Sequence, residues 1–337
     1  MKNQIYYWSS ENFKESGEGQ LSILFLKILK KKLKNTSFKR LNTYQYKINF
    51  FYKYLLPFYG ILKVWFYHLR GYKTIYVNYL PLWNFLIFLL LPKKSLLGPI
   101  SGTYYVNQEA NFLQKKIRKF LFPIFFQISI KILNYQKRYT IFSNNNFLHL
   151  KNKIKSIHNF QILYFKENKI NLKKDIDIFI YLRSHSNKNS EKIERIINYL
   201  KNSKYKIFVV GKNFNAKNIN SVKYLKNEKL NFFLKRSKLV LLSSEILFTF
   251  FCLEALSNNS KIVFFRNFKN NEEKLLSKDT YVKILSKSNK KLINHIEKVL
   301  NSKKKINFKN KFRFLLNERK KTIGLFNKYF IKTIFKQ

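Results

Sequence analysis

Apolar runs and amphipathic segments alternate along the second half of the chain. Short apolar runs, typical of buried strands, occupy residues 177–182, 205–210, 221–225, 238–242, 261–265 and 281–285. Segments with apolar positions at helical spacing separate most of them, at 190–202, 228–236, 250–258, 269–277 and 289–302. Strands that alternate with helices indicate a parallel sheet covered on both faces, so we expect a doubly wound α/β domain here.

The first half shows the same alternation less regularly. We predict strands at 5–8, 74–80, 95–101 and 138–144, and helices at 20–34, 80–91 and 107–136, the last kinked at Pro123. The pattern weakens over 151–174, where lysine and asparagine dominate, and we place the domain junction there. The prediction is therefore an α/β chain with Rossmann-like domains at 1–160 and 161–310, and a final helix over 311–337 that packs near the junction.

Charge raises the question of an anionic partner. The 337 residues include 67 Lys+Arg and 17 Asp+Glu, a formal net charge of +50, which is typical of proteins that bind nucleic acid or anionic membranes. The lysines, however, are spread from Lys2 to Lys336, and the excess of Lys, Asn, Ile, Phe and Tyr is what an A+T-rich coding sequence produces. We therefore do not expect nucleic acid to be the main partner, and keep an anionic membrane surface as a further one.

Cysteine usage and apolar stretches bear on the compartment. The single cysteine, Cys252, excludes an intrachain disulfide and fits a reducing environment. The N-terminus does not resemble a signal peptide, and the most apolar stretch, 80–91, is shorter than the roughly 20 residues of a spanning helix. We expect a cytoplasmic protein, or one peripheral on the inner face of the cytoplasmic membrane. The aromatic segments 80–91 and 120–133 fit either a bilayer surface or buried core helices.

Glycine is scarce, so its positions are informative. Five of the 8 glycines lie in predicted loops at the carboxyl ends of strands: Gly17, Gly19, Gly98, Gly102 and Gly211. Ligands bind at that edge of open α/β sheets, where glycine lets backbone amides approach a phosphate. The alternative is that these glycines only mark turns.

Arg183 and Lys188 stand five positions apart in the polar loop RSHSNKN, directly after the strand at 177–182. A diphosphate needs fixed positive charge on more than one oxygen, which arginine supplies as a planar donor fork and lysine as a point charge. A solvated surface loop is the alternative.

A second segment, SSEILFTFFCLEAL at 243–256, carries Glu254 in an apolar helix, where burial would require a hydrogen-bond donor such as a ribose hydroxyl. The alternative there is an exposed helix face.

The order of these features resembles the C-terminal donor domain of GT-B glycosyltransferases, in particular the large group with a Glu-x7-Glu signature. The resemblance covers about residues 175–302 and implies that Arg183 and Lys188 bind the donor diphosphate and Glu254 binds the ribose. It also implies donor-binding positions at Gly211, Glu245, Phe248 and Thr249. Two positions depart from the signature: Glu245 is one residue too far from Glu254, and Thr249 replaces a glycine.

The first domain supports the resemblance. GPISGTYY at 98–105 resembles a GP-x-GG element, with Gly98 and Gly102, and SGEG at 16–19 resembles the glycine loop where donor and acceptor meet. The resemblance implies two domains facing each other across a cleft. It also implies a hexosyltransferase-type enzyme that moves a sugar from a nucleotide sugar to a hydroxyl of a glycan or lipid-linked glycan, with retention and without metal or cofactor. Cell-surface polysaccharide biosynthesis (O-antigen, capsule or lipopolysaccharide) is the expected context.

The catalytic base is not defined by any motif. Glu18, in the first glycine loop, and His185, beside the diphosphate pair, are candidates by position. Asp175-Ile-Asp177 mimics a DxD metal motif but precedes its strand instead of following it, so we interpret it as the start of that strand. The competing class is a non-catalytic binding protein on a glycosyltransferase-like scaffold, attached to anionic membrane or nucleic acid through its basic surface.

Overall fold

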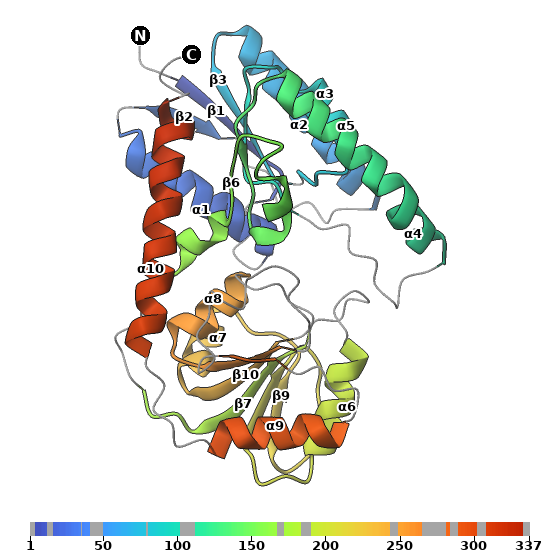
Figure 1. The fold of residues 1–337 in the computed structure, drawn as a ribbon, viewed down its shortest axis with the longest axis vertical. Helices are drawn as coiled ribbons and strands as arrows, with labels where there is room; N and C mark the ends of the chain where they lie inside the picture. The colour runs from blue at the N-terminus through green and yellow to red at the C-terminus, as the bar shows by residue number, and fades with distance from the viewer. Residues whose placement is uncertain are drawn as a thin grey trace. The chain divides into compact units, whose positions relative to one another are not determined.

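A computed structural model describes residues 4–11, 16–34, 36–40, 50–78, 80–101, 112–166, 172–182, 190–242, 249–264, 281–283, 289–301 and 308–332. The chain forms two compact units (Figure 1). Unit 1 comprises Met1–Val106, Asn111–Leu163 and Lys320–Gln337, and unit 2 comprises Asn107–Ala110 and Tyr164–Arg319.

Unit 1 contains a parallel sheet. Its strands β1 (Gln4–Ser9), β2 (Ser37–Arg40), β3 (Lys73–Val77) and β4 (Leu96–Leu97) lie in the order β2-β1-β3-β4. Parallel bridges from Pro81 to Ser101 and from Ile100 to Phe142 continue toward the parallel pair β5 (Thr140–Ile141) and β6 (Ser156–Ile157). The predicted parallel α/β sheet is therefore confirmed for this half of the chain.

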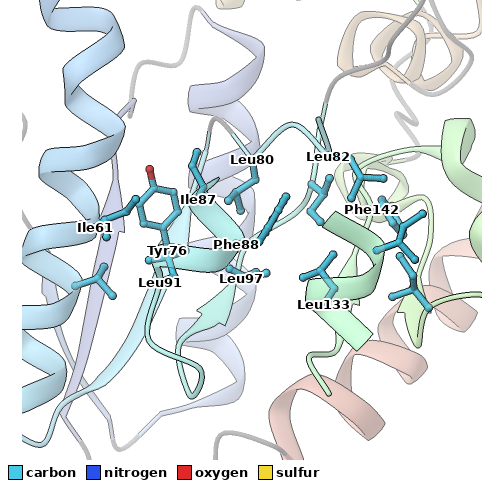
Figure 2. Close-up of a cluster of buried hydrophobic side chains, with 14 of the residues drawn as sticks. Ile61, Tyr76, Leu80, Leu82, Ile87, Phe88, Leu91, Leu97, Leu133 and Phe142 are labelled. Carbon is cyan, nitrogen blue, oxygen red and sulfur yellow. The ribbon is translucent and has the colours of Figure 1, made fainter. Parts of the chain in front are cut away.

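Alternate residues of β1 enter cores on opposite faces of this sheet, as the period of two in a strand requires. Tyr6 and Trp8 join a core formed with α2 (Phe50–Leu69), α3 (Phe85–Leu90) and α5 (Phe122–Tyr135), part of which Figure 2 shows. Tyr7 instead contacts Phe25 of α1 (Gly17–Lys32). Phe25 in turn packs against the short 3-10 helix η3 (Phe160–Tyr164) and the π-helix η6 (Phe326–Ile331). A second 3-10 helix, η2, spans Asn145–Leu150.

Three features of unit 1 differ from the prediction. The sequence pattern predicted neither α2 nor β2; α2 is missed because residues 50–69 are mostly apolar and offer few polar positions to mark a helix surface. The kink expected at Pro123 is a π-helical turn, η1 (Ile117–Leu121), between α4 (Phe112–Lys116) and α5. Proline cannot donate to a preceding carbonyl, and a widened turn directly before it accommodates that loss.

Unit 2 contains a six-stranded parallel sheet in the order β12-β11-β10-β7-β8-β9. Its strands are β7 (Ile176–Tyr181), β8 (Ile207–Val210), β9 (Ile219–Val222), β10 (Ser237–Leu242), β11 (Lys261–Phe264) and β12 (Tyr281–Lys283). The helices are α6 (Ser190–Leu200), α7 (Asn227–Lys235), α8 (Phe250–Ser257) and α9 (Asn289–Asn301), and the helix predicted at 269–277 lies outside the described residues. This is the predicted doubly wound domain.

Residues 308–331 are helical. Helix α10 (Phe308–Leu325) continues into η6, so this helical segment begins in unit 2 and ends in unit 1. Among the described helices, none combines the length and hydropathy that crossing a bilayer requires.

Candidate functional site

The strand order of unit 2 defines where a ligand would bind. Counting the strands of this sheet from β7, the order is the doubly wound 3-2-1-4-5-6, which reverses between the neighbours β7 and β10. Crevices for ligands form outside the carboxyl ends of the strands at such a switch point. Ile180 of β7 lies beside Leu241 of β10, so residues 183–189 and 243–248 follow adjacent strand ends. Arg183, His185, Lys188, Glu245 and Phe248 belong to these segments, which are outside the described residues, and their roles stay predictions.

Glu254 is buried in α8, which follows β10. Its exposed fraction is 7%, so the alternative of an exposed helix face is wrong. The carboxylate accepts a hydrogen bond from the Tyr164 hydroxyl at 2.5 Å, and no other donor reaches it from the described part of the chain. Burial raises the pKa of Glu254 above its usual range, while the hydrogen bond from Tyr164 acts in the opposite direction. One donor leaves a buried carboxylate with unused acceptor capacity.

Tyr164 is a part of this site that sequence reasoning missed. It lies 90 residues before Glu254, at the end of η3, and its ring packs edge-on against Phe250 with the centroids 4.8 Å apart. Burial, followed by the nearby carboxylate, raises its pKa, so the hydroxyl stays protonated and can donate. No local pattern marks this tyrosine, because the fold alone brings the two residues together.

Thr249, where the resembling family has a glycine, has a clear local role. It is the N-cap of α8, with extended backbone at φ −60° and ψ 158°, and its Oγ1 accepts a hydrogen bond from the Cys252 amide at 3.2 Å. Threonine is a preferred residue at this position because its side chain satisfies an otherwise unpaired helix amide. The cap fixes where α8 begins and thus where Glu254 lies.

Gly211 directly follows β8, and the backbone conformation there requires a glycine. Its φ is +119°, and a Cβ there would lie 1.8 Å from the carbonyl oxygen of Leu182, the last described residue before the Arg183 loop. The Gly211 amide donates to the Val222 carbonyl at 2.8 Å. This glycine therefore lets the ends of β7 and β8 approach each other, and its own amide is already bonded within the sheet.

The acidic pair at the start of β7, Asp175 and Asp177, is engaged in ion pairs. Arg236 donates two hydrogen bonds to the Asp175 carboxylate, one of them from Nε at 2.7 Å, and this contact lowers the pKa of Asp175. Asp177 pairs with Lys238 at 2.7 Å and accepts from the Lys206 amide at 2.9 Å. Both carboxylates lie at the amino end of β7, away from the switch-point edge. In the described ranges, no group of three or more His, Cys, Asp or Glu side chains could hold a metal ion.

Unit 1 has its own switch point, between β1 and β3. Asn78 directly follows β3 with a left-handed backbone, φ 72°, and its Nδ2 donates to Ser9 Oγ at 2.9 Å and to the Glu11 carbonyl at 2.6 Å. Asn78 Oδ1 and Ser10 Oγ are buried without a hydrogen-bond partner in the part of the chain that the structure describes. We did not predict these residues. The available signal was an asparagine and a Ser-Ser pair, each at the end of an apolar strand.

Glu18 lies at the same edge, in the first turn of α1. Its Oε1 accepts a hydrogen bond from Ser101 Oγ at 2.5 Å, and the Ser16 hydroxyl caps the helix by accepting from the Gly19 amide at 2.9 Å. The prediction of a glycine loop at 16–19 was wrong in this respect, because Gly17 and Gly19 are helical. Asparagine, serine and acidic residues favour helix starts, which makes SGEG a capping sequence.

Gly98 is explained by packing, and its partner glycine is not described. A Cβ at Gly98 would lie 2.8 Å from Val77 Cγ2, and the Gly98 amide donates to the Tyr76 carbonyl at 2.7 Å. Gly102 lies outside the described residues. The role of Gly98 in ligand binding stays a prediction.

Further polar groups follow β5 and β6. The side chains of Ser143, His158 and Asn159 each have a buried nitrogen or oxygen without a partner among the described residues. His158 Nε2 lies 2.9 Å from Ser156 Oγ, and burial, then Lys151 and His149, lower its pKa to about 4. Its ring is therefore neutral near neutral pH. Asn78, Ser9 and Ser10, which we call the Asn78 cluster, lie at the ends of β1 and β3. With the groups after β5 and β6, they make the carboxyl ends of several strands in unit 1 polar.

Comparison with known proteins identifies the fold. No protein-family model matches the sequence, and no curated protein does. Among solved structures, the forosaminyltransferase SpnP matches with TM-score 0.50 and 7% identity over 99% of both chains. The GtfA/B complex matches with TM-score 0.50 and 10% identity over 81% of this chain, and TarM with TM-score 0.47 and 13% identity over 78%. This chain spans 60% of the GtfA/B chain and 54% of TarM, and at such identities the likeness shows the fold alone. The chain has the GT-B fold, with two Rossmann-like domains, as predicted.

Proposed function

We propose that the chain is a glycosyltransferase that moves a sugar from a nucleotide-sugar donor to a hydroxyl acceptor, with unit 2 binding the donor. The observation that carries the proposal is the buried Glu254 carboxylate in α8, the helix that follows β10 of the switch point, with Tyr164 as its one described donor. A buried acidic group is costly unless hydrogen bonds stabilise it. The two hydroxyls of a ribose would supply such bonds.

In this proposal the charges of the Arg183 loop act on the departing diphosphate. When the bond between the sugar C1 and the diphosphate oxygen breaks, negative charge develops on that oxygen, and Arg183 and Lys188 stabilise it. The N-terminus of α8 adds partial positive charge near the same strand ends. These groups supply the electrostatic stabilisation without a metal ion. We also propose that the new bond retains the anomeric configuration, in line with the Glu-x7-Glu resemblance.

The acceptor is proposed to bind unit 1. At the carboxyl edge of its sheet, buried polar atoms such as Asn78 Oδ1 and Ser10 Oγ have no partner among the described residues, and they suit a ligand rich in hydroxyl groups. A glycan of a cell-surface polysaccharide, free or lipid-linked, has this chemistry. Glu18 and His185 are the candidate bases for the acceptor proton. We expect Glu18→Gln to lower turnover while leaving the donor dissociation constant unchanged.

The test is a thermal-shift and calorimetry panel of nucleoside diphosphates and nucleotide sugars. A ligand at 100 times its Kd stabilises the folded state by about 2.7 kcal/mol, which is readily measured. Arg183→Ala and Lys188→Ala should each weaken the best ligand by about tenfold to a hundredfold, the range for losing a hydrogen bond to a charged group. Lys204→Ala is the matched control, because Lys204 is an exposed cation before β8, at the opposite end of the strand from Gly211.

The panel also separates the proposal from its alternative. A nucleotide that binds wild type and the Lys204 variant equally, but the Arg183 and Lys188 variants weakly, supports the donor site. If no nucleotide or nucleotide sugar binds, and the protein is retained on DNA or vesicles in a salt-dependent manner, the chain is a non-catalytic binding protein instead.

A further inference from the structure

The outward side of three helical segments in unit 1 is unusually apolar. We call it the outer helical face, meaning the exposed side chains of α2, α3 and the continuous segment α4-η1-α5 at 112–135. Every exposed large apolar side chain in the described residues lies on it except Leu172, Tyr199, Tyr224 and Phe232. Leu62 is 68% exposed, Leu69 79%, Phe112 72% and Leu113 69%. Apolar exposure concentrated in this way marks an interaction site rather than ordinary surface.

Direct contacts make this face continuous. The Trp65 indole of α2 donates to the Leu90 carbonyl at the end of α3, at 2.7 Å. The residues on either side of α3 reach α5: the Trp83 ring stacks on Phe122 with centroids 5.1 Å apart, and Lys93 lies over the Tyr135 ring. Figure 1 shows α2, α3 and α5 side by side along one side of the sheet, and α3 contacts both neighbours.

The outer apolar residues are additional to those the core needs. On α2, Ile61, Val64 and Tyr67 already bury the inner side against β1 and β3, while Leu62, Trp65 and others point away from that core. A helix that is apolar on both sides is normally buried all round. The outer side chains of these segments are exposed, which leaves this side of the described helices available to a partner.

Charge indicates which partner. Lys63, Arg70, Lys116 and Lys119 lie over exposed aromatic rings of the face, with Lys116 Nζ 4.5 Å from the centroid of Phe112. In the sequence, Glu109 is the only acidic residue between Gly19 and Phe165. The face therefore combines aliphatic side chains, aromatic rings and positive charge. Nucleic acid would engage the cations but leave the leucines in water, whereas an anionic bilayer provides both an acyl layer and negative headgroups.

We propose that the outer helical face binds the surface of an anionic lipid bilayer, with Leu62, Leu69, Phe112 and Leu113 entering the boundary between headgroups and acyl chains. The lysines and arginines between them contact the phosphate groups. In this arrangement the helical segments lie along the bilayer surface with their outer side chains in its interface. The inference uses a different surface from the switch-point edges and does not depend on the proposed transfer reaction.

The experiment is flotation of the full-length protein with vesicles of phosphatidylcholine alone or mixed equally with phosphatidylglycerol. We expect binding to the anionic vesicles that weakens with salt. Leu62→Gln/Leu69→Gln should lower the partition coefficient by about tenfold per leucine, and Lys63→Gln/Arg70→Gln by about fivefold per cation on anionic vesicles. Tyr199→Gln/Tyr224→Gln is the control, since both are exposed large side chains of unit 2 and should leave binding unchanged.

Trp65 provides an independent readout of orientation. In a Trp83→Phe background the remaining tryptophans are Trp65, which is 40% exposed, and Trp8, which is fully buried. Brominated lipids should quench that protein, and should quench it much less once Trp65→Phe is added. Phe112→Gln/Leu113→Gln repeats the aliphatic test on another helix should the α2 variant fail to fold. The proposal is overturned if the wild-type protein binds neither type of vesicle, or if the Leu62/Leu69 and the Phe112/Leu113 double variants both bind like wild type. It is also overturned if the protein forms a dimer without lipid and these variants dissociate that dimer. Donor-nucleotide binding should be unaffected throughout, which keeps this result separate from the donor site.

Discussion

Replacing Tyr164 with phenylalanine removes one hydroxyl from unit 2 and, with it, the one described donor to the buried Glu254 carboxylate. The hydrogen bond is short, 2.5 Å, and its acceptor is only 7% exposed, so water cannot readily replace the lost donor. Hydrogen bonds to charged groups contribute about 1.5–3 kcal/mol, and we expect the free energy of unfolding to fall by about that amount at pH 8. The ring contact with Phe250 is retained, so packing should contribute little.

The pH dependence has a definite sign. Because burial raises the pKa of Glu254 above its usual 4.5, the folded state binds a proton more tightly than the unfolded state there. The stabilisation from this group is therefore fully present below pH 4.5 and is lost as the pH rises through the raised pKa. At low pH a neutral carboxyl accepts a weaker bond, so the cost of Tyr164→Phe should shrink to about 1 kcal/mol.

The measurement is urea unfolding of a double-mutant cycle with Glu254→Met, which removes the acceptor at similar volume. Tyr164→Phe should cost about 1.5–3 kcal/mol in wild type and almost nothing in the Glu254→Met background. Glu254→Met alone should gain stability relative to wild type as the pH rises above 4.5, since it removes a buried charge. Equal costs of Tyr164→Phe in both backgrounds would refute the assignment of this hydrogen bond as the stabilising contact.

Three other positions give quantitative expectations for the free energy of unfolding. Gly60→Ala should lower the free energy of unfolding by about 1–3 kcal/mol in chemical denaturation, because the added Cβ would lie 2.2 Å from Trp8 Nε1. Gly324→Ala on α10 should instead raise it by up to about 1 kcal/mol, because the added Cβ there meets no other atom. Gly211→Ala should cost about 2 kcal/mol or more, because its φ is +119° and the end of β7 blocks a side chain; an unchanged midpoint would contradict the close approach. The pKa of His158 is lowered from 6.5 to about 4, so the free energy of unfolding should fall by up to about 3 kcal/mol as the pH falls from 6.5 to 4. His158→Phe should remove this pH dependence, which melting curves at a series of pH values would show.

The fold of unit 2 was predictable because most of its strands are short apolar runs between amphipathic segments, although β9, with the sequence INSV, begins two residues before its predicted start at 221. DIFIYL, YKIFVV and KLVLL became β7, β8 and β10 with small shifts at their ends. Unit 1 was less predictable, since α2 is apolar on both sides and lacks the polar stripe from which a surface helix is recognised. The property that hid α2 from pattern analysis is the one that makes its outer side a candidate membrane surface.

The site was predictable only where one residue type is costly at one position. Glu254 stood out because a carboxylate interrupts an apolar helix, and the structure shows that it is buried. Tyr164 and Asn78 did not stand out, because a tyrosine or an asparagine is unremarkable until the fold places it against a partner 90 or 69 residues away. Gly211 was correctly predicted to follow a strand, but its amide donates to the Val222 carbonyl of the sheet. The sequence alone cannot distinguish that bond from a contact with a phosphate.

The two units share one arrangement that stability alone does not explain. Each buries polar groups in a segment that follows a strand of its switch point, Glu254 in α8 after β10 in unit 2 and the Asn78 cluster after β1 and β3 in unit 1, where apolar residues would be less costly. If Glu254→Met is more stable than wild type at pH 8 and also fails to bind a nucleotide, the carboxylate is kept for its ligand and not for the fold. If the variant is less stable and still binds nucleotide like wild type, the carboxylate with Tyr164 is a structural pair, and the donor site must be sought elsewhere.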